Sequence, residues 1–192
     1  MTGIEESSQT TEVPQVNPQS DVHFHAVSTL ARHLAGRFGA NIYELRGESS
    51  LIIKAEQILQ VCQALRDEEN FEMLVEQTAV DYWPAQTPRF HVVYRLRSLK
   101  RNLIIGLRVP LDGNAPVMPS ITSLYSNANW FEREIWDMFG IGFTGHPDLR
   151  RIVMPHDWEG HPLRKDYPLG YEEVQYSFNF DEIDLRKPYA KE

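Results

Sequence analysis

Three histidines in the last quarter of the chain have side chains that could do chemistry. His146, His156 and His161 are interleaved with four acidic residues, Asp148, Asp157, Glu159 and Asp166. Such groups can ligate a metal ion or act as general acids and bases. Their spacings of ten and then five residues match no established metal-binding motif, and each histidine adjoins a proline. Turn formation and hydrogen bonding at an interface are therefore favoured, with a metal or catalytic centre as the alternative.

A glycine triplet lies just before the first of these histidines. Gly140, Gly142 and Gly145 match G-x-G-x-x-G, and Asp166 lies 21 residues beyond the last glycine. A dinucleotide site needs a strand before the glycines and a helix after them, so that backbone N–H groups meet the pyrophosphate. Here a helical pattern precedes the triplet and His146-Pro147 follows it. The triplet therefore predicts a helix exit, and no other motif in the sequence predicts an active site.

The composition excludes several classes of protein. The chain has 19 Lys+Arg against 27 Asp+Glu, a net charge of −8, and no basic cluster of the kind that binds nucleic acid. Iron–sulfur clusters, structural zinc sites and disulfide frameworks need several cysteines, and this chain has one. Cys62 falls on the apolar face of an expected helix. It is predicted to be a buried small hydrophobe in a reducing compartment.

The N-terminal region is acidic and the chain has no long apolar run. No stretch of consecutive hydrophobic residues exceeds three, whereas a membrane span needs about 20 mostly apolar positions. Residues 1–22 contain four acidic residues and no Lys or Arg, which fits neither a signal peptide nor a transit peptide. We expect these residues to form a flexible acidic tail.

Periodicity predicts an α+β domain over residues 23–143. Apolar residues at helical spacing predict helices at 26–38, 55–65 and 129–139, the last ending at Gly140. Strands are expected at 42–45, 51–54, 71–82, 90–97 and 103–109. This order predicts a two-layer sandwich: a mainly antiparallel sheet with helices on one face, followed by a long extended C-terminal tail.

The last predicted helix carries a string of charges between aromatic residues. Glu132, Arg133, Glu134 and Asp137 would normally form a solvated face. The flanking Trp130, Phe131 and Trp136 make full exposure of that face unfavourable. Buried or interfacial ion pairs are therefore favoured.

Residues 144–192 are predicted to be an extended, partner-binding tail. Five prolines exclude a helix of ordinary length, and irregular segments this long are normally functional loops or disordered linkers. Seven aromatic residues argue against disorder. Tyr176 and Phe178 belong to an alternating pattern, residues 174–180, that could add a strand to a sheet. We expect the tail to lie over another protein; folding back on its own domain is the alternative.

Residues 129–169 resemble one family over about forty consecutive positions. The helix exit FEREIWDMFGI, the stretch GHPDLRRI and the run DWEGHPLRKDYP occur in order. They are similar to the 30 kDa subunit, also called the C subunit, of type-I NADH:quinone oxidoreductase, respiratory complex I. The preceding domain carries no motif of comparable specificity.

This resemblance implies a non-catalytic structural subunit of the peripheral arm of a proton-translocating complex. FMN, iron–sulfur clusters and quinone would be held by partner subunits, with no cofactor in this chain. Its chief partner would be the quinone-site subunit, called the D subunit, with adjacent cluster-bearing subunits, and its membrane association would be through the complex. The implied structural and docking positions are Glu132, Arg133, Glu134, Asp137, His146, Asp148, Arg150, Arg151, Asp157, Trp158, Glu159, His161, Arg164, Lys165, Asp166 and Tyr167.

Other assignments stay open at the level of sequence. Membrane-bound hydrogenases and ferredoxin-linked or plastid-type dehydrogenases contain similar chains. A stand-alone metal- or NAD-dependent enzyme and a freestanding adaptor are rivals from other classes. The acidic N-terminus favours the cytoplasmic side of a bacterial inner membrane, with the mitochondrial matrix side expected if the source is eukaryotic.

Overall fold

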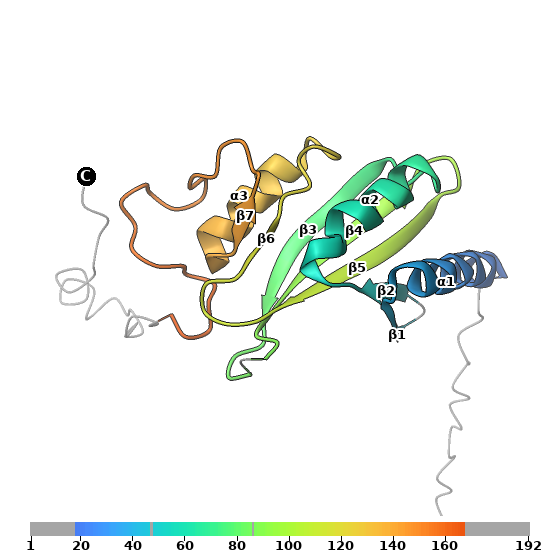
Figure 1. The fold of residues 1–192 in the computed structure, drawn as a ribbon, viewed down its shortest axis with the longest axis horizontal. Helices are drawn as coiled ribbons and strands as arrows, with labels where there is room; N and C mark the ends of the chain where they lie inside the picture. The colour runs from blue at the N-terminus through green and yellow to red at the C-terminus, as the bar shows by residue number, and fades with distance from the viewer. Residues whose placement is uncertain (1–17, 47, 86, 168–192) are drawn as a thin grey trace, which may run out of the picture.

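The computed structural model describes residues 18–46, 48–85 and 87–167, and it shows a five-stranded main sheet and three α-helices (Figure 1). In chain order the elements are α1 Pro18–Phe38, β1 Asn41–Leu45, β2 Glu48–Ile52, the 3-10 turn η1 Ala55–Gln57, α2 Ile58–Asp67, β3 Met73–Asp81, β4 Phe90–Ser98, β5 Leu103–Leu111, β6 Val117–Pro119, α3 Ala128–Phe139 and β7 Gly142–Thr144. The predicted α+β class is confirmed.

The main sheet has the strand order β1-β2-β5-β4-β3, and only the β2–β5 pairing is parallel. Its strands alternate as the sequence predicted. On β4, Phe90, Val92, Tyr94 and Leu96 are fully buried, whereas the residues between them are half-exposed. The buried faces of α1, α2 and α3 join the same apolar core, so all three helices cover one face of the sheet. The other face carries no helix within the described residues.

The structure differs from the sequence prediction in two main ways, besides shifts of strand ends such as that of β2, which spans Glu48–Ile52 where 51–54 was predicted. Helix α1 begins at Pro18, so it includes residues 18–22 of the predicted acidic tail. Its first turns lack the apolar spacing that marked the helix at 26–38, although proline is favoured at a first helical position. The second difference is a parallel pair, β6 with β7, which brackets α3. These three-residue strands are too short to show a period-two pattern.

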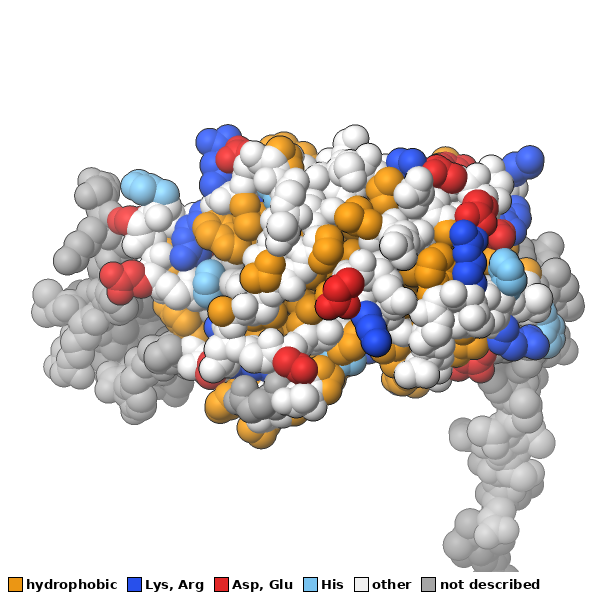
Figure 2. All heavy atoms as spheres, viewed as in Figure 1, with side chains coloured by type: hydrophobic (Ala, Val, Ile, Leu, Met, Phe, Trp, Pro, Cys, Tyr) orange, Lys and Arg blue, Asp and Glu red, His pale blue; other side chains and the backbone are white. Residues whose placement is uncertain are grey.

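Helix α3 packs against β3, and residues 145–167 loop round the side of the helix that faces away from the sheet (Figure 1). On the face shown in Figure 2, acidic and basic side chains are interspersed with apolar ones and form no large area of a single sign. The loop thus places most of the residues singled out in the sequence around a single helix.

Candidate docking site around helix α3

Helix α3 is tied to the domain at its first turn. The side-chain amide of Asn127, just before the helix, donates to the carbonyl of Leu74 on β3 (2.8 Å). The helix ends at Gly140, whose φ of 71° is left-handed and whose N–H donates to the carbonyl of Trp136 (2.8 Å). Left-handed backbone at this position favours glycine. The predicted helix exit is confirmed.

The loop satisfies the last carbonyls of α3, which have no partners within the helix. His161 contacts the Asp137 carbonyl through Nδ1 (2.9 Å), and the Leu163 N–H donates to the Met138 carbonyl (3.0 Å). Arg164 donates to the Phe139 carbonyl. A Cβ at Gly140 would clash with the His161 ring. The glycine therefore lets the loop approach the helix end closely.

Asp137 anchors the middle of the loop. Its carboxylate is fully buried and accepts the backbone N–H groups of Ile152 (3.1 Å), Val153 (2.9 Å) and Met154 (2.9 Å). Arg151 forms an ion pair with the same carboxylate. Burial alone would raise the pKa of Asp137, but these donors outweigh burial and hold the pKa below its ordinary value. One carboxylate thus organises the consecutive loop residues 151–154 against the helix.

The upstream part of the loop is held by two further residues. Arg133 is buried, donates to the carbonyls of Arg150 (3.1 Å) and Arg151 (3.4 Å), and stacks over the Trp130 ring (5.1 Å). His146 contacts the Asn129 carbonyl through Nε2 (3.2 Å). Because Trp130, Arg133 and Asp137 share one stripe of the helix, residues 146–154 lie along that stripe.

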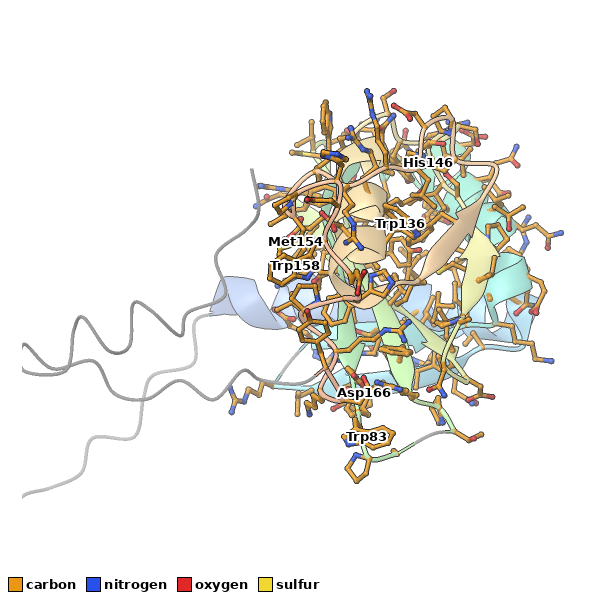
Figure 3. The ribbon with its side chains drawn as sticks, turned by 90° about the vertical axis from the view of Figure 1, so that its left-hand side faces the viewer. Trp83, Trp136, His146, Met154, Trp158 and Asp166 are labelled. Atoms are coloured by element: carbon orange, nitrogen blue, oxygen red, sulfur yellow. The ribbon has the colours of Figure 1, made fainter. Side chains whose placement is uncertain are left out.

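The far end of the loop is fastened by Arg89, which the sequence prediction missed. Its guanidinium is fully buried and contacts both oxygens of Asp81 (3.1 and 3.2 Å) and both oxygens of Asp166 (2.6 and 3.0 Å). It lies 5.0 Å from the Trp83 ring and 4.7 Å from the Phe90 ring. Figure 3 shows Trp83 and Asp166 next to each other at this end. We call Asp81, Arg89 and Asp166 the Arg89 clamp.

Half of this clamp had a signal in the sequence. Asp81 is the last residue but one of the strand predicted at 71–82, and Arg89 directly precedes the strand predicted at 90–97. Pairing the two as a hairpin would have placed the two opposite charges across from each other. The structure does so, since Asp81 pairs with Phe90 and the Tyr82 N–H donates to the Arg89 carbonyl. The contact with Asp166, 77 residues away, had no local signal.

Glu132 is a buried charge of α3 that, unlike Arg133 and Asp137, does not hold the loop. It is fully buried, and one oxygen accepts the N–H of Ile121 (2.8 Å). Its other oxygen has no hydrogen-bond partner in the described part of the chain, and neither has the neighbouring amide of Gln77. Burial raises the pKa of Glu132 to about 7, although the nearby Ser120 hydroxyl and the Ile121 N–H oppose the shift.

The buried Glu132 predicts a stability that falls as pH rises. The folded pKa lies above the unfolded value, so stability is full below about pH 4.5 and is lost as pH rises through about 7. Replacing Glu132 with glutamine removes the charge. We expect E132Q to gain about 2–3 kcal/mol in unfolding free energy at pH 8 and to lose this pH slope, as measured by urea unfolding. The exposed neighbour Glu134 supplies the control, E134Q, which should keep the parent profile; an unchanged slope in E132Q would contradict the prediction.

The remaining docking positions divide by exposure. Trp158 and Tyr167 are half-buried, and Tyr167 donates to the Glu159 carbonyl (3.2 Å). Tyr176 and Phe178, with the expected strand at 174–180, lie outside the described residues. His156 is exposed. So are seven of the predicted docking positions: Glu134, Asp148, Arg150, Asp157, Glu159, Lys165 and Asp166.

The described part of the tail, residues 145–167, contacts its own helix α3, in agreement with the alternative that the tail folds back on its own domain. Its contact with a partner stays a prediction. Within the described residues, no group of three or more His, Cys, Asp and Glu side chains is placed to hold a metal ion. None of the described helices is both long enough and apolar enough to cross a membrane.

Comparisons with known proteins agree on one family. Residues 51–173 match the family described as respiratory-chain NADH dehydrogenase, 30 Kd subunit. The C subunit of NADH-quinone oxidoreductase from Roseiflexus sp. (strain RS-1) is 52% identical over 151 residues, which cover 78% of this chain and 86% of the relative. The protein of the same name from Herpetosiphon aurantiacus is 42% identical over 168 residues, covering 86% of this chain and 98% of the relative.

Solved structures show the same fold. A trypsin-resistant fragment (1–134) of Nqo5 is 32% identical, with a TM-score of 0.55, and the match covers 66% of this chain and 99% of that one. A chain of an archaeal membrane-bound sulfane sulfur reductase has a TM-score of 0.65 at 18% identity, covering 86% and 95%, which shows the fold alone. The family match extends the resemblance from residues 129–169 to most of the chain. This chain therefore belongs to the family of the 30 kDa subunit, the C subunit, of respiratory-chain NADH-quinone oxidoreductase.

Proposed function

We propose that this chain is a structural subunit of the peripheral arm of a proton-translocating NADH:quinone oxidoreductase. Its role would be to dock onto the quinone-site subunit, the D subunit, and to hold that partner in its working geometry. The names of its relatives support the membership, and the rigid attachment of the loop to α3 supports the docking role. When the residues that support a functional site are displaced by about 1 Å, the activity of that site can fall strongly.

The observation that carries this proposal is a set of exposed apolar side chains on α3 and its loop. Trp130 is 63% exposed, Val153 58% and Leu163 53%, although the backbone next to each is tied down by the contacts above. Ile152 adds to the group. Rigid, exposed aromatic and aliphatic side chains are typical of interface hot spots. We call these four residues the α3–loop surface.

We expect the α3–loop surface to be needed for assembly. The double variant W130S/V153S should lower the amount of this chain that co-migrates with the complex about thirtyfold. The reason is that a tryptophan hot spot contributes about 2 kcal/mol or more to the binding free energy. Native gel electrophoresis of membranes solubilised in mild detergent measures this. L99S removes an equally exposed leucine at the β4–β5 turn and should assemble as the parent does. Normal assembly of the double variant, with its unfolding free energy unchanged, would refute the docking surface.

We assign no catalytic group to this chain. In this proposal FMN, the iron–sulfur clusters and quinone are held by partner subunits, and the chain meets the membrane only through the complex, on the cytoplasmic side in a bacterium. Purification tests this part directly. The isolated chain should carry no stoichiometric flavin, iron or zinc and should not oxidise NADH, whereas the complex should do so; bound cofactor or turnover in the isolated chain would favour the rival enzyme.

A further inference from the structure

The open face of the main sheet is a second surface that the docking site round α3 does not use. Its residues are the outward-pointing members of each strand, such as His91, Val93, Arg95 and Arg97 on β4. All three helices lie on the opposite face, as shown by the core they share. Nothing within the described residues packs over this face as a helix or a second sheet.

This face is more apolar than a solvated sheet requires. An antiparallel sheet with one wet face normally alternates apolar and polar residues, with the polar ones outward. Here a large share of the outward positions is apolar, and several are markedly exposed: Tyr43 37%, Leu45 52%, Met73 43%, Val80 37%, Tyr82 41% and Ile104 39%. These side chains lie on β1, β3 and β5 and just past the end of β3, so the apolar exposure extends across the sheet, and exposed apolar area of this kind is typical of interaction sites.

A row of aromatic rings joined by one arginine crosses the face. His91 stacks edge-on against Tyr82, with ring centroids 4.9 Å apart. Arg108 donates to the Tyr82 hydroxyl (3.4 Å), and its guanidinium carbon lies 4.8 Å from the Tyr43 ring. The row thus joins β4, the end of β3, β5 and β1. Tyrosine and arginine are among the residues most enriched at the centres of interfaces.

The arginines of this face are short of carboxylate partners. Arg95 is paired with Glu48 (2.8 Å), but Arg97 and Arg108 form no ion pair within the described residues. The Nε atoms of both are buried without a hydrogen-bond acceptor there. This is unusual in a chain with 27 acidic and 19 basic side chains. Buried donors of this kind are normally satisfied.

We propose that the open face of the sheet docks the acidic, apolar surface of another subunit of the complex, with Arg97 and Arg108 receiving its carboxylates. This inference rests on the proposed function, which places the chain among other subunits, but it uses a different surface. Charge decides between occupants. A second copy of this chain in a two-fold contact would set one arginine-bearing face against another, with no added carboxylates to receive Arg97 and Arg108, and like charges across an interface are unfavourable.

Site-specific photo-cross-linking in the assembled complex tests the occupant. A photoreactive phenylalanine analogue at Tyr43 or Ile104 should cross-link to one other subunit, within a peptide rich in Asp and Glu. The same analogue at Arg32, an exposed position on α1, which covers the opposite face, should not. Cross-links to a second copy, to residues 1–17 or 168–192 of the same chain, or to nothing would each overturn the proposal.

Charge reversal supplies the energetic test. R97E/R108E should lower the amount of chain retained in the complex about tenfold at physiological ionic strength, because each carboxylate would then meet a like charge. R32E, on the exposed side of α1 and away from this face, is the control and should change retention by less than about twofold. The isolated R97E/R108E chain loses only exposed side-chain contacts, those of Arg97 with Asn102 and of Arg108 with Tyr82 and Tyr43, so it should stay folded, as urea unfolding measures. Full retention of R97E/R108E would contradict this inference. If W130S/V153S lost retention in the same assay while R97E/R108E did not, the docking site round α3 would be supported and the open face would not.

Discussion

Replacing Asp137 with asparagine is expected to lower the free energy of unfolding by about 3–5 kcal/mol. The change removes the charge that holds the nearly buried Arg151, and it leaves an amide NH₂ facing donors, either the backbone N–H groups or the Arg151 guanidinium. Residues 150–160 should then leave α3. Urea unfolding of the full chain measures the loss, and limited proteolysis should show new cleavage within this loop.

The pH dependence of Asp137 gives the same experiment a second readout. Its folded pKa is below the ordinary value, so its contribution is present above about pH 4 and is lost as pH falls through the folded pKa. Parent and D137N should therefore converge in strong acid. E134Q, on the same helix but exposed, should lie within about 0.5 kcal/mol of the parent. An unchanged midpoint and proteolysis pattern for D137N would show that the carboxylate does not organise the loop.

Replacing Arg89 with methionine should cost a similar amount, about 3–5 kcal/mol near pH 7, by leaving two carboxylates without their cation. The side chain of Asp81 is only 1% exposed, so its charge would be buried and unpaired. Hydrogen bonds from Arg89 are the main cause of the lowered pKa of Asp166, and they oppose burial at Asp81. Removing Arg89 should raise both pKa values, measurable by carbon-13 NMR of the aspartate carboxyls.

The sign of this effect with pH follows from those shifts. Because the folded pKa values of Asp81 and Asp166 are depressed, the stability from the Arg89 clamp is present above about pH 4 and fades in acid, so R89M and the parent should converge there. R37M is the matched control, since Arg37 contacts Glu68 through the same two-pronged geometry (2.6 and 2.9 Å) but is exposed. It should cost less than about 1 kcal/mol. Equal losses in R89M and R37M would contradict the role of burial.

The fold class could be predicted from the sequence because most of the long elements carry their own local pattern. Alternation along β4 and helical spacing along α2 and α3 reflect which side of the element meets the core. The stop at Gly140 was equally local, since a left-handed residue ends a helix wherever the chain then goes. The early start of α1 and the β6–β7 pair escaped because their residues carry no such pattern.

The candidate site was only partly readable. Residues 129–169 indicated the family and included most of the side chains that lie round α3. The neighbouring charged residues on that helix nevertheless differ in burial and in pKa. Glu132 faces the core with a raised pKa, Asp137 collects backbone donors and has a lowered pKa, and Glu134 is exposed. Spacing on a helix gives the direction of a side chain. It does not say what covers that direction, because the covering loop lies elsewhere in the chain.

The sequence by itself therefore determined the elements, the family and the concentration of candidate docking residues in and after the last helix. Only the tertiary structure decided which charges are buried, which loop residues cap α3 and that Arg89 clamps Asp166 across 77 residues. The physical reason is that periodicity, glycine stops and composition act over a few neighbouring residues. Burial, ion pairing and pKa shifts depend on groups that only folding brings within a few ångströms.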